Sequence, residues 1–255
     1  MDAAQVLARD ADAEAFFDKW RNSWPALGAA RLFASENEWP RLRARVGVSF
    51  EIAEASWLLT DATVREHKLM WWHEELQRHA QGQARHPLLL AAPALMLSPR
   101  IVAAALASLH ESAPADASQT LTRVTRLAAH ATDAEVGHVA GQLLLAAVYL
   151  LALRAGRVSA FAHAPLDLRA RFAVADAAGG MALASLSSAL AAAWQGELSL
   201  RFTNLSRRDW QGSRGLRVLS QLALDLIHGL ARGREPSGPN VLGTVRAWAC
   251  VVGLR

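Results

Sequence analysis

The sequence predicts an all-α protein, and three observations lead to that prediction. Alanine and leucine dominate, whereas valine and isoleucine are sparse. Apolar residues recur three and four positions apart, as on one face of an α-helix, and two-residue alternation is rarely sustained. The chain has 255 residues, of which 52% are apolar and 20% charged, so it can bury a large core. We expect one helical domain covering residues 1–255.

The expected helices follow one another along the chain with prolines as punctuation, since a proline lacks the amide hydrogen that a helix interior needs. The clearest loop is expected at residues 233–239. The helices are expected at Ala3–Ser23, Trp39–Leu59 and Asp61–Gln81, then in shorter pieces, and at Ala134–Ala155, Leu166–Trp194, Gly215–Leu230 and Val241–Val252. The prolines are Pro25, Pro40, Pro87, Pro93, Pro99, Pro114, Pro165, Pro236 and Pro239.

Cysteine usage and the N-terminal residues indicate a cytoplasmic protein. Cys250 is the single cysteine, so no internal disulfide can form and a reducing compartment is expected. Asp2 stands where a secretory signal would carry basic residues. The most apolar stretch, 139–153, is shorter than the roughly 20 residues that cross a bilayer.

Charge is distributed unevenly along the chain. Residues 1–150 hold 14 basic and 17 acidic side chains, whereas residues 151–255 hold 13 basic and 6 acidic ones. A basic excess could face an anionic lipid, a diphosphate or an acidic partner. The arginines are scattered among leucines and tryptophans instead of forming a dense stripe, so we expect no nucleic-acid partner.

Three segments in the first 90 residues carry a family resemblance. Residues 68–88 contain Trp71-Trp72, then a glycine turn, then Arg85-His86-Pro87. Upstream lie Lys19-Trp-Arg-Asn-Ser-Trp-Pro and Phe50-Glu-Ile-Ala-Glu-Ala-Ser-Trp. Together they resemble a divergent bacterial branch of the squalene/phytoene synthase family.

That resemblance implies an isoprenoid-synthase-like helical bundle in which two aspartate-rich motifs hold magnesium ions that bridge a prenyl diphosphate. Magnesium prefers oxygen ligands in octahedral geometry, so opposed carboxylate pairs are needed to hold it. Where the resemblance implies the first motif, this chain offers Glu51, Glu54 and Asp61, with no aspartate pair.

The second implied motif is also incomplete. The glycine-led segment 180–190 has serine and alanine where asparagine, arginine and aspartate would be needed. A competing placement at 202–209 supplies one carboxylate, Asp209. We therefore expect no metal site and no cofactor, with magnesium needed only if the chain is an active enzyme.

Aromatic and basic residues suggest a ligand pocket. Trp57, Trp71 and Trp72 could line a prenyl cavity, because aromatic faces offer apolar area and stabilise carbocations. We favour the alternative, in which the three rings fill the core. Arg207 and Arg208 could lie at the mouth of such a pocket.

Other polar patterns have simpler interpretations. Asp10, Glu14 and Asp18 are four residues apart and could ligate a metal, but we expect them to be solvated acids of a first helix. Glu75 and His79 could act as a base and its orienting partner, but local helix pairing is the expectation. Arg85-His86-Pro87 is expected to stop a helix.

These observations leave three functional hypotheses. The first is a catalytically diverged family member that acts as a binding or assembly protein, in the cytoplasm or peripheral to the inner membrane. The second is an active magnesium-dependent prenyl transferase that uses farnesyl or geranylgeranyl diphosphate. The third is a carrier or sensor of an isoprenoid or another lipid.

Overall fold

All regular structure in the described part of the chain is helical. The computed structural model describes residues 3–57, 59, 61–95, 97–109, 116–131, 138–154, 165–179, 189–190, 192–197, 213–232 and 249. Its labelled helices are α1 (Ala3–Ser23), α2 (Leu27–Arg31), α3 (Trp39–Trp57), α4 (Ala62–Ala80), α5 (Pro87–Leu90), α6 (Arg100–Leu109), α7 (Ala117–Ala131), α8 (His138–Arg154), α10 (Leu166–Gly179) and α12 (Arg214–Ala231). The prediction of an all-α protein is confirmed for these residues.

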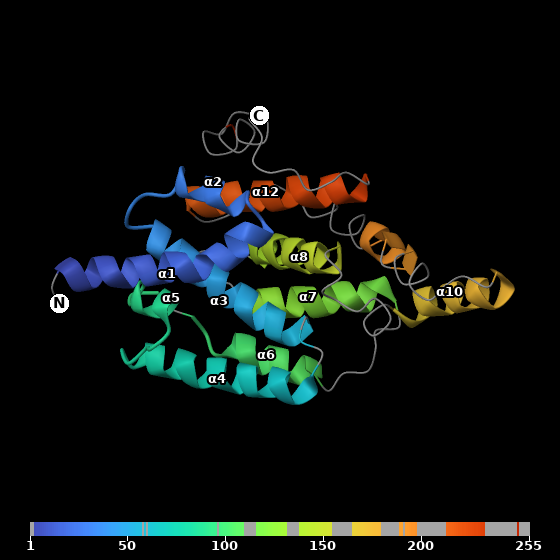
Figure 1. Ribbon diagram of the computed structural model, residues 1–255, viewed down its shortest axis with the longest axis horizontal. Helices are drawn as coiled ribbons and strands as arrows, with labels where there is room; N and C mark the ends of the chain where they lie inside the picture. Colours follow the sequence, from blue (N-terminus) through green and yellow to red (C-terminus); the bar gives the residue numbers. More distant parts are fainter. Residues whose placement is uncertain are drawn as a thin grey trace.

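Helix α3 lies at the centre of the bundle. It packs against α1, α4, α5, α6, α7, α8 and α12. Figure 1 shows α4 and α6 on one side and α2 with α12 on the opposite side. Fifteen of the 19 residues of α3 are buried, so the polar side chains on this helix must find partners inside the protein.

Caps and a turn glycine set the limits of α4. The Asp61 carboxylate accepts hydrogen bonds from the backbone amides of Thr63 and Val64, at 2.8 and 3.1 Å, and so caps the helix at its N-terminus. At the other end Gly82 adopts φ +73°, a left-handed conformation that glycine tolerates without strain.

The segment Arg85-His86-Pro87 begins a helix as well as following one. Pro87 is the first residue of α5, and the His86 imidazole accepts a hydrogen bond from the Leu88 amide at 3.2 Å. Proline suits a first helical position because its fixed φ is already helical and no hydrogen bond is lost. The expectation of a simple helix stop is therefore corrected: Gly82 ends α4, and Pro87 starts α5.

None of the helices within the described ranges combines the length and hydropathy that a membrane span requires.

Candidate functional site

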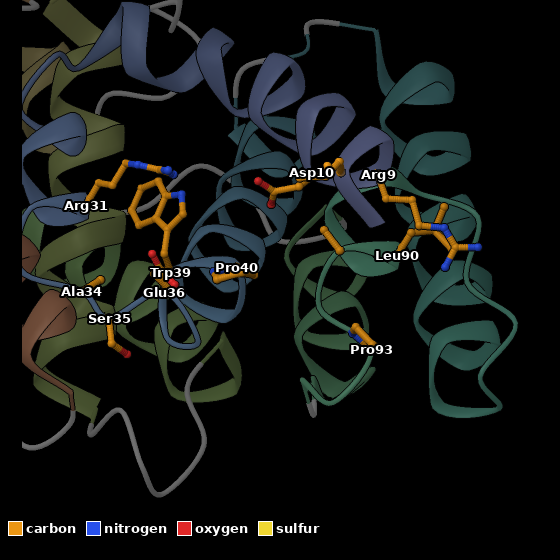
Figure 2. Close-up of a pocket in the computed structure, with 12 residues that line it drawn as sticks. Arg9, Asp10, Arg31, Ala34, Ser35, Glu36, Trp39, Pro40, Leu90 and Pro93 are labelled. Carbon is orange, nitrogen blue, oxygen red and sulfur yellow. The ribbon is translucent and has the colours of Figure 1, made fainter. Parts of the chain in front are cut away.

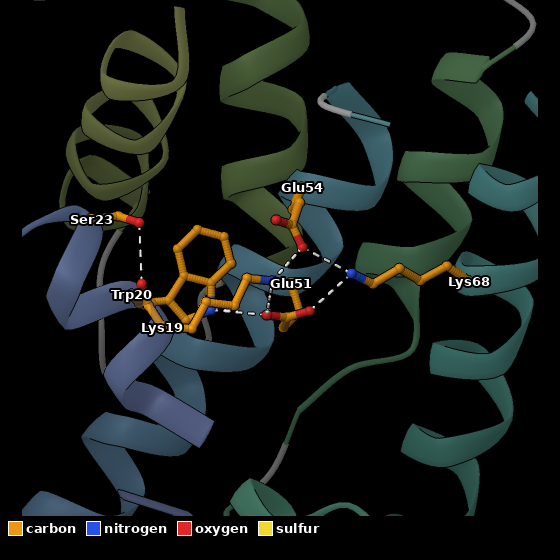
Figure 3. A network of polar contacts seen from close by, with 6 residues as sticks. All are labelled: Lys19, Trp20, Ser23, Glu51, Glu54 and Lys68. Carbon is orange, nitrogen blue, oxygen red and sulfur yellow. Dashed lines mark hydrogen bonds and ion pairs between the residues drawn. The ribbon is translucent and has the colours of Figure 1, made fainter. Parts of the chain in front are cut away.

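Two buried glutamates on α3 form the centre of the candidate site. Glu51 and Glu54 are three residues apart, so their side chains leave the helix on the same face. Their exposed fractions are 3% and 6%. Figure 3 shows both carboxylates pointing into the space between α1 and α4.

Two lysines bind this carboxylate pair, one from each neighbouring helix. Lys19 Nζ of α1 lies 2.8 Å from Glu51 Oε1 and 2.5 Å from Glu54 Oε2. Lys68 Nζ of α4 lies 2.9 Å from Glu51 Oε2 and 2.9 Å from Glu54 Oε2. We call Lys19, Glu51, Glu54 and Lys68 the four-charge cluster. The Trp20 indole adds a hydrogen bond to Glu51 Oε1 at 3.0 Å.

The four-charge cluster favours the charged forms of Glu54 and Lys68. Burial by itself would raise the pKa of Glu54, but hydrogen bonds from Lys19 and Lys68 hold that pKa below its ordinary value. Burial by itself would lower the pKa of Lys68, but Glu51 and Glu54 raise it above its ordinary value. Both groups are therefore charged at neutral pH.

The donor set does not fit a magnesium ion at this position. Each carboxylate already accepts hydrogen bonds from two ammonium groups, and the two charges of each sign balance. Asp61 is occupied as the cap of α4. Across the described ranges, no three histidine, cysteine or acidic residues are grouped closely enough to hold a metal. A cation at Glu51 and Glu54 would have to displace a lysine.

Neither lysine was predicted from the sequence as part of a site, although the sequence carries a signal for both. The chain contains only two lysines, against 25 arginines, and both belong to the cluster. Each also begins one of the segments that carry the family resemblance. A count of this rare residue type would have singled them out, but the pairing itself joins residues 14 to 35 positions apart.

The three candidate pocket tryptophans have three different environments. Trp72 is 1% exposed and belongs to the core, whereas Trp71 is 42% exposed. Trp57 is half-buried and packs edge-on against Tyr149, with ring centroids 5.1 Å apart. The rings of Trp71 and Trp72 pack edge-on against each other, with centroids 5.0 Å apart. The core-filling alternative requires all three rings to be buried. Only Trp72 meets this requirement in full.

Glu75 stabilises the turn after α4 instead of pairing with His79. It is fully buried and accepts hydrogen bonds from the backbone amides of Arg85 and His86, at 2.6 and 2.7 Å. Burial alone would raise the pKa of Glu75, but these amides and Arg78 lower it. His79 instead contacts the Leu95 carbonyl at 2.6 Å. Local pairing occurs, but with a different partner: Glu75 binds Arg78 one turn later at 2.9 Å, and the expected pairing of Glu75 with His79 is wrong.

Three acids spaced four residues apart on α1 pair with arginines. We call Asp10, Glu14 and Asp18 the acidic ladder. Arg43, fully buried on α3, binds Asp10 at 2.6 Å and Glu14 at 2.8 Å. Arg31 also binds Glu14 at 2.8 Å. Asp18 pairs with Arg21 one turn along the helix. Asp10 and Glu14 therefore join α1 to α3, and Glu14 also joins it to α2, whereas the expectation was of solvated acids without such partners; the Asp10 and Asp18 side chains stay 43% and 40% exposed.

An open groove of about 810 Å³ lies beside this ladder. Figure 2 shows Arg31 next to the Trp39 ring at one end and Leu90 with Pro93 at the other. The Arg31 guanidinium lies 5.6 Å from the centre of the Trp39 ring. The lining residues are Leu7, Arg9, Asp10, Arg31, Ala34, Ser35, Glu36, Trp39, Pro40, Leu90, Ala91 and Pro93. Trp57, Trp71 and Trp72 are not among them.

Several sequence candidates lie outside the described residues. They are Arg207, Arg208 and Asp209, together with the glycine-led segment from residue 180 to 188. Comparisons with protein-family models, with curated proteins and with solved structures find no match.

Proposed function

We propose that the chain is a catalytically diverged squalene/phytoene synthase-like protein that acts as a binding or assembly protein. One observation carries the proposal: at the position of the implied first acidic motif, two lysines neutralise the two carboxylates. Ionisation of a prenyl diphosphate by that family's mechanism needs carboxylates that are available to magnesium. Carboxylates that already bind two ammonium groups are not available in this way.

The direct test is isothermal titration calorimetry with a non-hydrolysable farnesyl diphosphate analogue, with and without magnesium. We expect no binding that depends on magnesium, because Glu51 and Glu54 are already neutralised. Magnesium-dependent binding would contradict the proposal and favour the transferase alternative, with Glu51, Glu54 or Asp61 acting together with Asp209.

A turnover assay completes this test. Incubation with farnesyl or geranylgeranyl diphosphate and magnesium should give no condensation product. Product formation would establish the transferase and overturn the proposed role, whatever the calorimetry shows.

The open groove favours a second candidate function, that of a carrier for an isoprenoid or another lipid. Its volume is within the range of small-molecule sites, and its lining combines apolar side chains with a few charged ones. Native mass spectrometry of the purified protein tests this candidate. A co-purified lipid that is lost in a Trp39→Glu variant would support it, and a lipid-free protein would argue against it.

A further inference from the structure

The four-charge cluster joins three helices at one point. Lys19 reaches it from α1, Glu51 and Glu54 from α3, and Lys68 from α4. Each lysine contacts both glutamates, and each glutamate contacts both lysines. The network is therefore closed, with no charge left over among these four groups.

Burial makes a partner of opposite charge more necessary for the two glutamates than for the two lysines. The glutamate side chains are 4% and 8% exposed, whereas the lysine side chains are 41% and 28% exposed. A lysine that left the cluster could be solvated by water, but a buried carboxylate could not. The carboxylates therefore require a cation at this position.

The choice of lysine is specific. The chain uses arginine at 25 positions and lysine at only these two. An ammonium group is compact and its three donors can turn toward two carboxylates, whereas a guanidinium presents a flat, rigid fork. Lys19 and Lys68 each bridge two carboxylates on one helix face through a single Nζ atom.

We infer that Lys19 and Lys68 are built-in counter-cations that take the structural place of divalent metal at this carboxylate pair and hold α1, α3 and α4 together without it. The bonding of the lysines to the carboxylates rests on the side-chain geometry alone. The comparison with a divalent metal rests on the family resemblance that the proposed function also uses.

Thermal unfolding of variants tests the role of the lysines. Lys68→Met leaves the buried carboxylates with one cation, and we expect the melting temperature to fall by on the order of 10 °C. Adding Glu54→Gln removes the uncompensated charge and should recover part of that loss. Arg171→Met is the control, because Arg171 is exposed and its ion pairs are 3.5 Å long; its melting temperature should barely move. Equal melting temperatures for Lys68→Met and Arg171→Met would overturn the inference.

A measurement on the unaltered protein covers the case in which a variant does not fold. Labelling with ¹³C-lysine gives NMR signals from Lys19 and Lys68 alone, because the chain has no other lysine. Millimolar magnesium should leave both signals and the melting temperature unchanged, and a chelator should not lower that temperature. Lysine signals that shift on magnesium addition, or a chelator-sensitive melting temperature, would overturn the inference. Turnover of a prenyl diphosphate would contradict the proposed function. The lysine NMR signals and the melting temperature would still decide the role of the lysines.

Discussion

At the scale of single residues, His86 shows how packing changes the chemistry of a side chain. Its ring lies 4.4 Å from Phe16, 5.9 Å from Trp71 and 4.7 Å from Trp72, measured between ring centres. Burial in this aromatic site lowers the pKa of His86 to about 4, although Glu51 and Glu75 act in the opposite direction. His86 is therefore neutral at pH 7, and its Nδ1 atom remains able to accept a hydrogen bond from the Leu88 amide.

We predict that protonation of His86 destabilises the fold as the pH falls. The unfolded chain binds this proton near pH 6.5, whereas the folded protein binds it near pH 4. Between these values the unfolded state holds more protons, so the free energy of unfolding decreases with falling pH, by about 3 kcal/mol over the whole interval.

Chemical denaturation between pH 5 and pH 7 checks this prediction through the His86→Asn variant. Asparagine can still cap α5 but does not titrate, so the stability of the variant should be nearly independent of pH in this window. His67→Asn is the matched control, since His67 is exposed on α4; it should keep the pH dependence of the unaltered protein. A slope that persists in His86→Asn would refute the assignment.

At the scale of secondary structure elements, α12 is placed by close contact at its first turn. The Gly215 amide donates a hydrogen bond to Glu38 Oε1 at 3.0 Å, which joins α12 to the segment before α3. A Cβ atom at Gly215 would lie 2.7 Å from Leu42 Cδ2 and 3.1 Å from the Ala34 Cβ. A larger residue at this position would require the Leu42 side chain to move.

Two glycine substitutions in α12 should therefore have opposite effects. We predict that Gly215→Ala lowers the free energy of unfolding by about 1–3 kcal/mol, because it overpacks a filled contact. Gly229→Ala should raise it by about 0.5 kcal/mol, since a Cβ there meets no atom within 4 Å and alanine favours the helix. Denaturant titration of both variants measures the difference; equal effects at the two sites would show that the α12 contact is not close-packed.

At the scale of the whole molecule, α3 organises the bundle because it is buried on most of its surface. Its acidic side chains bind cations from α1 and α4, and Arg43 binds two acids of α1. On the side of α8, the Tyr149 ring packs edge-on against the rings of Trp57 and Trp194, with centroid distances of 5.1 and 5.5 Å. Burial raises the pKa of the Tyr149 phenol well above its ordinary value.

The buried phenol predicts a loss of stability at alkaline pH. Above about pH 10 the unfolded chain releases the Tyr149 proton while the folded protein retains it, so the free energy of unfolding falls as the pH rises. The Tyr149→Phe variant lacks this proton and should lose less stability between pH 9 and pH 11. Melting temperatures across this range give the comparison, and measurements at pH 7 serve as the internal control. Parallel curves for the two proteins would contradict the prediction.

The sequence by itself determined most of the longer helices in the described part of the chain, but it did not predict α2, and its expected helix at Leu166–Trp194 coincides with α10 only up to Gly179. The spacing of apolar residues predicted Ala3–Ser23 with the limits that α1 has, and placed α3, α4, α8 and α12 within a few residues of their ends. This works because helix formation depends on neighbours three and four residues away, together with prolines and glycines at the ends. The expected helix at 241–252 lies almost entirely outside the described residues.

Only the tertiary structure decided which residues meet. The sequence identified Glu51 and Glu54 but not the lysines that neutralise them, and it could not separate the exposed Trp71 from the buried Trp72. Glu75 was expected to pair with His79, yet it binds Arg78 of its own helix and the turn ten residues later. The physical reason is that helical periodicity is a local property, whereas charge pairing and burial depend on how the faces of distant helices are brought together.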